Sequence, residues 1–319
     1  MNIGDRFRKL VKIVKKVNVG GQALIEGVMM KGPNDIAMAV RKSDGEIVVK
    51  REPVSRIEKS KIVKIPIIRG GIALINSMVT GIKALTYSAE FFEEGIEEEK
   101  GKFELWLEKK FGDKSKDIMT YISVALAVAM AILVFMIIPT ILINFLKNKI
   151  SNTVILTGLE GILKIFMFIG YIIFISRLKE IQRVFEYHGA EHKAIHCYES
   201  GKPLTVENAK KFTTMHPRCG TSFLLIVLVI SILIFSLLGW KSIILRIAMK
   251  LLLLPLVAGI SYEIIKWAGK SDSKFAAVIS WPGLMMQKLT TREPDDKQLE
   301  VAIEALKNVL AEDKDVKLW

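Results

Sequence analysis

Long apolar runs separated by short charged segments fill the chain between Ile118 and Trp267. An α-helix needs roughly 20 predominantly apolar residues to cross the hydrocarbon core of a bilayer. Four runs approach or exceed that length: Tyr121–Leu146, Thr157–Ser176, Ser222–Trp240, and the stretch after Lys241 that reaches about Trp267. The pattern predicts a mainly α polytopic membrane protein with about four transmembrane helices, and it excludes an ordinary soluble enzyme.

Prolines and charged residues interrupt three of these runs. They are Pro139 in the first, Glu160 and Lys164 near the start of the second, and Arg246, Lys250, Pro255 and Glu263 in the fourth. A spanning helix tolerates proline where its neighbours satisfy the freed carbonyl, and basic side chains near a helix end can snorkel. A carboxylate inside a bilayer is costly, which predicts a partner for Glu263: either a metal ion or Arg218.

Basic residues are distributed unevenly between the connections. The chain has 46 Lys and Arg against 33 Asp and Glu, a formal net charge of +13, but it lacks the basic and aromatic alternation typical of a nucleic-acid groove. Segment 177–221 carries eight Lys and Arg residues, whereas segment 147–153 carries two. The positive-inside rule therefore predicts that 177–221 is cytoplasmic, and an even number of spans predicts that both termini are cytoplasmic.

The chain before the first run divides into two segments. Residues 1–19 are predicted to form a basic amphipathic arm that either contacts anionic lipid or is a solvated tail. The arm lacks the apolar core of a signal peptide. Residues 20–117 are predicted to form a soluble or interfacial module, with a small β-hairpin around Asp44-Gly45 and an amphipathic helix from Ile72.

The remaining boundaries follow from the runs and their connections. We expect transmembrane helices 1 and 2 in 118–176, a cytoplasmic His/Cys loop domain in 177–221, transmembrane helices 3 and 4 in 222–268, and an interfacial segment with a C-terminal cytoplasmic helix in 269–319. The interfacial segment is too short to span, and Trp281-Pro282-Gly283 is expected to break it. Asp295 and Gln298 are expected to cap the C-terminal helix.

All four histidines and both cysteines lie between positions 188 and 219. His188, His192 and His196 occupy positions i, i+4 and i+8 of a predicted cytoplasmic helix from Leu178 to about Glu199. Because four residues rise roughly 6 Å along a helix, neighbouring histidines can share one metal ion. The outer two lie roughly 12 Å apart along the axis and cannot easily do so.

Residues 188–192 read His-Gly-Ala-Glu-His, the H-x-x-E-H arrangement of inverted zinc peptidases. In that arrangement two histidines bind Zn²⁺ and the glutamate, here Glu191, acts as general base. The remaining ligand would come from His196, His216, Cys219 or Glu263. The alternative is that the His and Tyr side chains line a hydrogen-bonded polar seam between helices, with the cysteines as small packing residues.

A second unusual stretch, residues 20–30, reads GGQALIEGVMM. Its glycines flank Gln22 and Glu26, which can reach a site if the backbone folds closely over it. A tight structural turn is the alternative, and we favour it. The stretch lacks the Lys-Ser/Thr pair of a phosphate loop. Tyr187 and Arg218 adjoin the candidate ligands and are further candidates for facing the site.

Three blocks together resemble the YqhQ-like family of bacterial membrane proteins. The blocks are residues 20–30, residues 187–196 (YHGAEHKAIH) and residues 216–223 (HPRCGTSF). The resemblance extends from Gly20 to the C-terminal helix and implies a multi-pass protein of the bacterial cell membrane. The family is described as predicted metal-dependent enzymes of unknown function.

Two functions of different classes are compatible with these features. The first is a Zn-dependent hydrolase whose cytoplasmic site acts on a lipid, a lipid-linked molecule or a membrane protein. The second is a non-enzymatic assembly or biogenesis factor that binds a translocon or ribosome, in which any metal would be structural and fully coordinated. A transporter is less consistent with the sequence, because the spans show no inverted repeat. The sequence predicts contact with the bilayer and does not specify an oligomeric state.

Overall fold

A computed structural model describes residues 19–55, 65–93, 101–217, 219–238, 242–268, 271 and 273–310. The predicted basic arm, apart from Val19, and the candidate Arg218 lie outside the described residues. The chain divides into two compact units. The first comprises Met1–Glu93, Tyr171–Ser231 and Leu254–Trp319, and the second comprises Glu94–Gly170 and Ile232–Leu253.

The first unit begins with an antiparallel four-stranded sheet in the order β1-β2-β3-β4. The strands are β1 (Gly20–Leu24), β2 (Gly27–Lys31), β3 (Asp35–Arg41) and β4 (Ile47–Pro53). The predicted hairpin is confirmed as the β3–β4 turn, where Gly45 has a φ of 91° and the Glu46 N–H donates to Asp44 Oδ1 at 2.9 Å. Glycine suits this position because it adopts positive φ without steric cost.

Residues 20–30 form a separate β-hairpin. The structural turn favoured from sequence is only the two-residue connection between its strands. Strands β1 and β2 pair from Gly20 opposite Lys31 to Leu24 opposite Gly27. Ile25 and Glu26 connect them, and Glu26 has a φ of 48°. A glutamate rarely adopts positive φ, and the connection lacks the Asn-Gly or Asp-Gly pair that indicates a two-residue hairpin loop. The sequence therefore gives no signal for a turn at this position.

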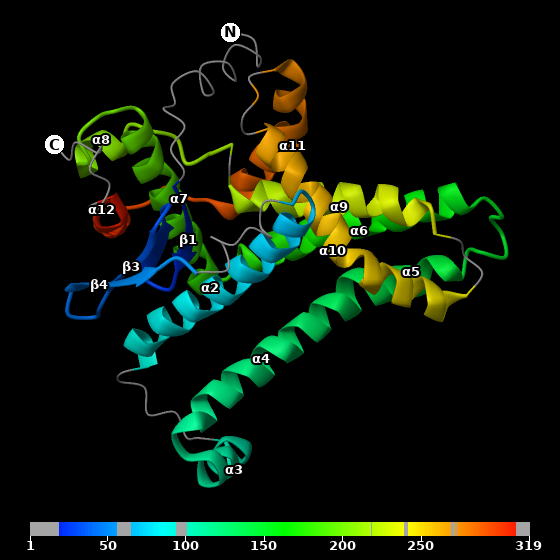
Figure 1. The fold of residues 1–319 in the computed structure, drawn as a ribbon, viewed down its shortest axis with the longest axis horizontal. Coiled ribbons are helices and arrows are strands. Elements are labelled where there is room, and N and C mark those ends of the chain that lie inside the picture. Colours follow the sequence, from blue (N-terminus) through cyan, green and yellow to red (C-terminus); the bar gives the residue numbers. More distant parts are fainter. Residues whose placement is uncertain are drawn as a thin grey trace. The chain divides into compact units, whose positions relative to one another are not determined.

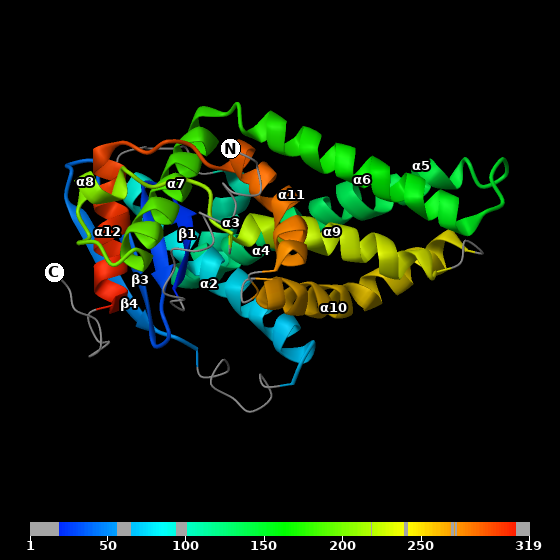
Figure 2. The same cartoon turned by 90° about the horizontal axis from the view of Figure 1, so that it is seen from above.

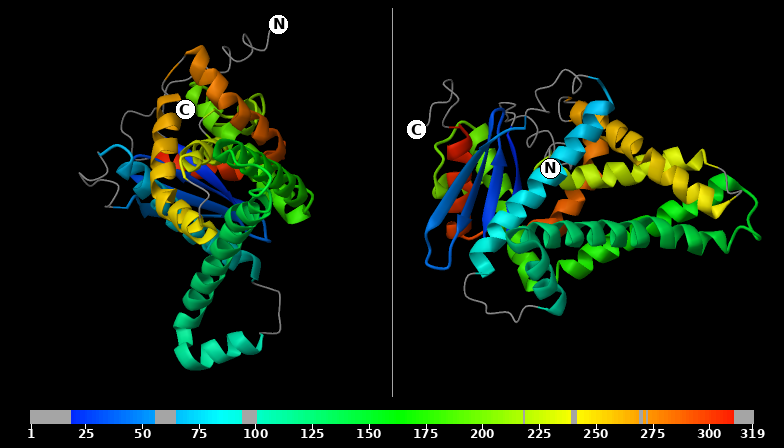
Figure 3. Two further views of the ribbon diagram at one scale, coloured as in Figure 1. Left: turned by 90° about the vertical axis from the view of Figure 1, so that its right-hand side faces the viewer. Right: turned by 60° about the horizontal axis from the view of Figure 1, so that its bottom comes forward.

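Alternation along the strands divides the side chains of the sheet between two helical layers. Helices α7 (Lys179–Glu199) and α12 (Asp296–Leu310) cover one face, and α2 (Ile68–Glu93) covers the other (Figures 2 and 3). The core on the first face includes Val28, Met30, Ala37, Ala39, Ala190, Ala194, Leu299 and Leu306. The core on the second face includes Leu24, Met29, Met38 and Ala84. Helix α7 packs on β1 and β2, and its small residues Ala190 and Ala194 allow a close approach to these strands.

The first unit also contains the elements that follow α7 and precede α12 (Figure 1). They are α8 (Val206–Ala209), most of α9 (Gly220–Ser236), the C-terminal part of α10 (Ile243–Ala268) and α11 (Lys274–Thr290). The predicted cap of α12 is confirmed: the Asp295 N–H donates to Gln298 Oε1 at 2.8 Å, and the Gln298 N–H donates to Asp295 Oδ1 at 2.7 Å. The two residues satisfy each other's backbone donors at the helix start.

The expectation that Trp281-Pro282-Gly283 breaks its segment is wrong, because α11 continues through all three residues. Proline removes one backbone donor from a helix, and the continued helix is supported here by close packing. A Cβ atom on Gly283 would lie 2.4 Å from Ser222 Oγ of α9, so glycine is what permits the two helices to touch. The residues that indicate a break in the sequence instead mark a helix–helix contact.

The second unit contains the elements between α2 and α7 together with the adjoining ends of α9 and α10. Its complete elements are α3 (Lys102–Phe111), η3 (Gly112–Lys114), α4 (Ser115–Ile132), η4 (Leu133–Ile137) and α5 (Ile138–Asn144), and most of α6 (Thr153–Ile175) also belongs to it. Helix α4, the π turn η4 and α5 form one continuous helix (Figure 1). The π turn ends at Ile137, two residues before Pro139. The helix thus continues through the proline, as predicted for a spanning helix, and a π turn is a usual local adjustment near such a residue.

Three helices in the described part of the chain are long and apolar enough to cross a membrane. They are Ile118–Asn144, Thr153–Ile175 and Ile243–Ala268, with 27, 23 and 26 residues. These correspond to the first, second and fourth predicted spans. The third prediction, Ser222–Trp240, corresponds to α9, which is apolar but has only 17 residues. Its predicted C-terminal end includes residues outside the described ranges. The structure thus supports membrane association with three candidate spans.

Candidate metal centre

Helix α7 carries three of the four histidines at the spacing predicted for it. It spans Lys179–Glu199, within one residue of the predicted start at Leu178. His192 and His196 are buried and His188 is half-buried. The ring centroids of His188 and His192 lie 4.4 Å apart, as expected for neighbours one turn apart on one helix face. His216 extends the row, with its ring centroid 5.5 Å from that of His192 and 4.6 Å from that of His196.

The first group of candidate ligands consists of His188, His192 and Cys219. One ligand atom from each lies within 4.8 Å of the others, and His188 Nε2 lies 3.1 Å from Cys219 Sγ. His188 Nδ1 contacts the Thr290 carbonyl at 2.8 Å, and His192 Nδ1 contacts the Thr214 carbonyl at 2.5 Å. A carbonyl only accepts hydrogen bonds, so both Nδ1 atoms are protonated and both Nε2 atoms retain a lone pair. Metal-binding histidines are held in this way, because the outer hydrogen bond fixes tautomer and ring orientation.

The second group consists of His196, Glu199 and His216, all three buried. Its ligand atoms also lie within 4.8 Å of one another, and His216 Nε2 lies 3.3 Å from Glu199 Oε2. The two groups separate His188 from His196, as their distance along the helix axis predicts. Glu199 is not among the residues predicted from sequence. Its position three residues after His196, on the same helix face, is the signal that identifies it.

The protonation states of the first group suit metal binding. Burial lowers the pKa of His192 to about 4, so its imidazole is neutral at neutral pH. Burial raises the pKa of Cys219, but its interactions with His192 and Thr221 outweigh this effect and leave the pKa below its ordinary value. Cys219 directly precedes α9, and the Thr221 N–H faces its sulfur at 3.5 Å. The first backbone donors of a helix favour a thiolate, the form that binds a metal.

Glu191 lies beside this group and has a strongly altered acidity. Burial raises its pKa to about 7; His188 opposes the rise, Cys219 adds to it, and a hydrogen bond from the Gly21 backbone lowers it. A carboxyl group with a pKa near neutrality can both accept and release a proton at neutral pH. The role of general base, assigned from the H-x-x-E-H spacing, is therefore chemically available to Glu191.

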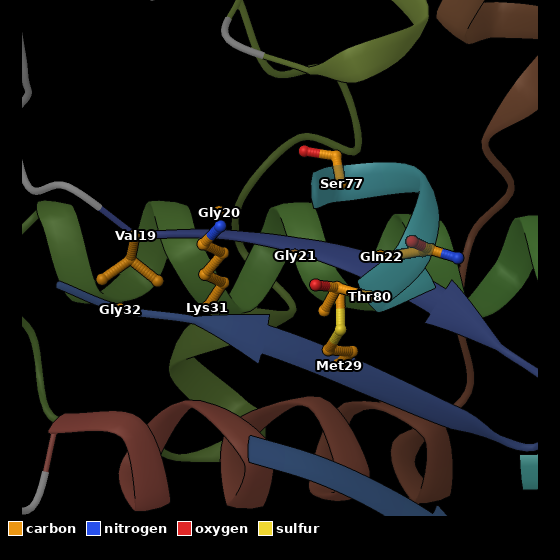
Figure 4. Close-up of a pocket in the computed structure, with 9 residues that line it drawn as sticks. All are labelled: Val19, Gly20, Gly21, Gln22, Met29, Lys31, Gly32, Ser77 and Thr80. Atoms are coloured by element: carbon orange, nitrogen blue, oxygen red, sulfur yellow. The ribbon is translucent and has the colours of Figure 1, made fainter. Parts of the chain in front are cut away.

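Gly21 is the residue through which the stretch 20–30 contacts the candidate site. A Cβ atom on Gly21 would lie 2.9 Å from Cδ of Glu191 and 2.6 Å from the carbonyl of Met29. Only glycine permits β1 to lie this close to α7. Gly21 also lines a cavity of about 330 Å³ formed with Gln22, Met29, Lys31, Ser77, Thr80 and other residues (Figure 4). Sequence reasoning considered the polar residues of this stretch and missed the glycine.

Gly189 allows the segment that carries the Thr290 carbonyl to approach His188. A Cβ atom on Gly189 would lie 2.0 Å from the Arg292 carbonyl oxygen. The Arg292 N–H donates to the Phe185 carbonyl at 2.9 Å, so the segment after α11 crosses directly over α7 at this glycine. Thr290 lies at the end of α11, two residues earlier. The Gly in His-Gly-Ala-Glu-His thus permits the contact that positions the first histidine.

Three other predicted residues lie in structural contacts instead of joining the two groups. The Gln22 amide contacts the Gly81 carbonyl of α2 at 3.5 Å. The Tyr187 hydroxyl donates to Glu26 Oε2 at 3.0 Å. Glu26 also forms an ion pair with Arg183 of α7. These contacts tie the β1–β2 hairpin to α2 and to α7, and so help to hold Gly21 against Glu191.

Glu263 has a charged partner, as expected for a carboxylate in an apolar helix. The partner is Arg69, which was not among the predicted partners. The Arg69 Nε donates to Glu263 Oε1 at 2.5 Å, and its Nη2 donates to Glu263 Oε2. This two-pronged ion pair joins α2 to α10 within the first unit. The structure therefore does not bring Glu263 into either group of candidate metal ligands.

Comparison with known proteins places the chain among proteins without an assigned activity. The profile of the family described as "Protein of unknown function (DUF1385)" matches residues 65–312. The chain is 36% identical over 297 residues to the "Uncharacterized protein YqhQ" of Bacillus subtilis (strain 168), covering 91% of this chain and 92% of that protein. No solved structure matches the chain. Together, the matched family and the extent of this identity establish that the chain belongs to the YqhQ-like DUF1385 family.

Proposed function

We propose that this protein is a membrane-associated, metal-dependent hydrolase whose metal centre is formed by His188, His192 and Cys219. The observation that carries the proposal is the convergence of these ligand atoms while backbone carbonyls hold the opposite ring nitrogen of both histidines. Two imidazoles and a thiolate suit Zn²⁺. Catalytic zinc sites use three protein ligands and leave a position open, and His188 is the group's half-buried member.

A zinc ion bound there would act as a Lewis acid and lower the pKa of water near it. Glu191 would accept a proton from the attacking water and return it to the leaving group, which its pKa of about 7 permits. The Gly21 backbone would hold the carboxylate in place. His192 and His188 would keep their neutral tautomers through the carbonyls of Thr214 and Thr290.

The substrate class follows from location. The candidate spans favour a substrate in or at the bilayer, which is a lipid, a lipid-linked molecule or a membrane protein. The excess of basic residues in 177–221 favours a site at the cytoplasmic face. Both termini lie on that same side if the shorter apolar helix α9 is a fourth span.

The test combines metal analysis with hydrolysis by the detergent-purified full chain. Probe substrates are a phospholipid, a prenyl-linked phosphate ester and a membrane-inserted peptide, with products followed by mass spectrometry. We expect Glu191→Gln to lower the rate by about 10²-fold or more while metal content is retained, because it removes a base and keeps the ligands. His192→Ala should release the metal. Glu180→Gln, on the exposed first turn of α7, is the matched control and should change neither.

Two outcomes would contradict this assignment. Loss of metal in Glu191→Gln would make Glu191 a ligand instead of a base. A stoichiometric metal with no hydrolysis of any probe would favour the assembly-factor alternative, in which the ion is structural and the partner is a translocon or ribosome.

A further inference from the structure

The second group of ligands has the geometry of a metal site in its own right. His216 Nε2 lies 3.3 Å from Glu199 Oε2, and His196 Nδ1 lies 4.0 Å from the same oxygen. Ligand atoms around a tetrahedral ion with bonds of about 2.1 Å lie roughly 3.4 Å apart. Only small side-chain adjustments would therefore close these three atoms around one ion.

The surroundings orient the imidazole of His196 toward Glu199 and fix the backbone of His216. His196 Nε2 contacts the Met215 carbonyl at 3.0 Å, so it carries the proton and Nδ1 keeps its lone pair. The backbone of His216 is held on both sides by the side chain of Gln287. The His216 N–H donates to Gln287 Oε1 at 2.7 Å, and Gln287 Nε2 donates to the His216 carbonyl at 2.8 Å. Ring and backbone are thus positioned by groups outside the ligand set, as in metal sites generally.

The two groups share no residue and differ in chemistry. The first offers two nitrogens and a sulfur, whereas the second offers two nitrogens and a carboxylate oxygen. They adjoin where the rings of His192 and His216 lie 5.5 Å apart. The second set also connects two segments, because Glu199 and His196 belong to the last turns of α7 and His216 belongs to the segment that leads to Cys219.

We propose that His196, Glu199 and His216 bind a second divalent transition-metal ion, separate from the ion at His188, His192 and Cys219. All three side chains are buried, so this ion would be shielded from bulk solvent. It fastens the segment before α9 to the end of α7 and thereby positions Cys219, which lies three residues after His216. This site does not require that the protein be a hydrolase. Its ligand set suits Zn²⁺, Fe²⁺ or Mn²⁺.

Titration of the metal-free, detergent-purified full chain with Co²⁺ distinguishes the two sites. Thiolate ligation gives an intense sulfur-to-cobalt charge-transfer band, which only the first site can produce. We expect the wild type to bind two equivalents and to show the band. Glu199→Gln should bind one equivalent and keep the band, whereas Cys219→Ser should bind one equivalent without the band. Glu180→Gln is the matched control and should behave as the wild type.

Each other outcome is decisive. A wild type that binds one equivalent, unchanged by Glu199→Gln, overturns the second site and leaves the first intact. Binding of one equivalent that is lost in Glu199→Gln but not in Cys219→Ser supports the second site and overturns the centre of the proposed hydrolase. Loss of both equivalents in a folded Glu199→Gln protein means that the residues form one shared centre, which overturns a separate ion. If Glu199→Gln does not fold, His196→Gln is read by the same criteria.

Discussion

Two adjacent glycines in β1 illustrate how a residue without a side chain can position a buried carboxyl group, here the candidate base Glu191. A Cβ atom on Gly21 would meet Glu191 and the Met29 carbonyl, whereas a Cβ atom on Gly20 would have nothing within 4 Å. The carboxyl group of Glu191 is therefore enclosed between its own helix, α7, and strand β1, which it contacts at Gly21. The altered acidity of Glu191 depends on this burial.

Gly21→Ala should therefore be harmful where Gly20→Ala is not. The added methyl group overpacks the contact between β1 and α7, which typically costs about 1–3 kcal/mol. We expect a lower Tm for Gly21→Ala, and a loss of any hydrolytic rate that exceeds the loss of metal, because Glu191 is displaced while the ligands remain. Differential scanning fluorimetry and metal analysis would measure both. Equal Tm values for the two variants would show that β1 and α7 separate at little cost.

At the scale of elements, a buried cluster of charges joins helices of the second unit. Glu160 of α6 accepts from Lys164 at 2.7 Å and from Arg246 of α10 at 3.2 Å, and it forms an ion pair with Lys250. Lys250 also donates to Thr140 of α5 at 2.8 Å. Charged groups in such apolar helices are costly unless they are paired. The carboxylate thus stabilises three cations at once.

Glu160→Gln should destabilise the protein strongly, because three buried cations lose the same partner. Breaking a buried ion pair by removing one member typically costs about 3–5 kcal/mol. Unfolding by sodium dodecyl sulfate in mixed micelles would measure the change. The exposed Glu108→Gln is the control on α3. Combining Glu160→Gln with Lys250→Met should recover part of the loss, since one unpaired cation is removed; additive losses would indicate that the two residues are not coupled.

Elements with a local signal were predictable, and elements defined by contacts between distant residues were not. The helix of His188, His192 and His196, the Asp44-Gly45 hairpin and the Asp295 cap all depend on residues within a few positions of one another. The β1–β2 hairpin turns at Glu26, which gives no turn signal. The sequence also could not decide which candidate joins which ligand group, because the choice depends on how His216 and Cys219 pack against α7.

The pairing of Glu263 shows the same limit for a single residue. The cost of a carboxylate in an apolar helix correctly predicted a partner, since that argument concerns the residue alone. Arg69 lies 194 positions away, and no local pattern connects the two. The helix of the candidate site and the separation of His188 from His196 were therefore predictable. The membership of Glu199, and the group that each of His216 and Cys219 joins, were not.

At the scale of the whole molecule, the distribution of charge leads to a prediction about topology. Segment 177–221 has eight basic residues and segment 147–153 has two, so the first should be cytoplasmic and the second external. Lys202 and Lys149 are exposed positions in these segments, whereas the native Cys197 and Cys219 are buried. Single cysteines introduced at the two lysines can therefore report on sidedness against a small background from the native thiols.

We expect a membrane-impermeant maleimide to label Lys149→Cys in intact cells and to leave Lys202→Cys unlabelled. Both should react after the membrane is permeabilised, and the wild-type chain provides the background from Cys197 and Cys219. Labelling of Lys202→Cys in intact cells would place α7 and both candidate metal groups outside. In that case the positive-inside rule fails for this chain, and a substrate would have to be sought on the external side. The candidate spans alone are compatible with either orientation, because their length and hydropathy carry no direction.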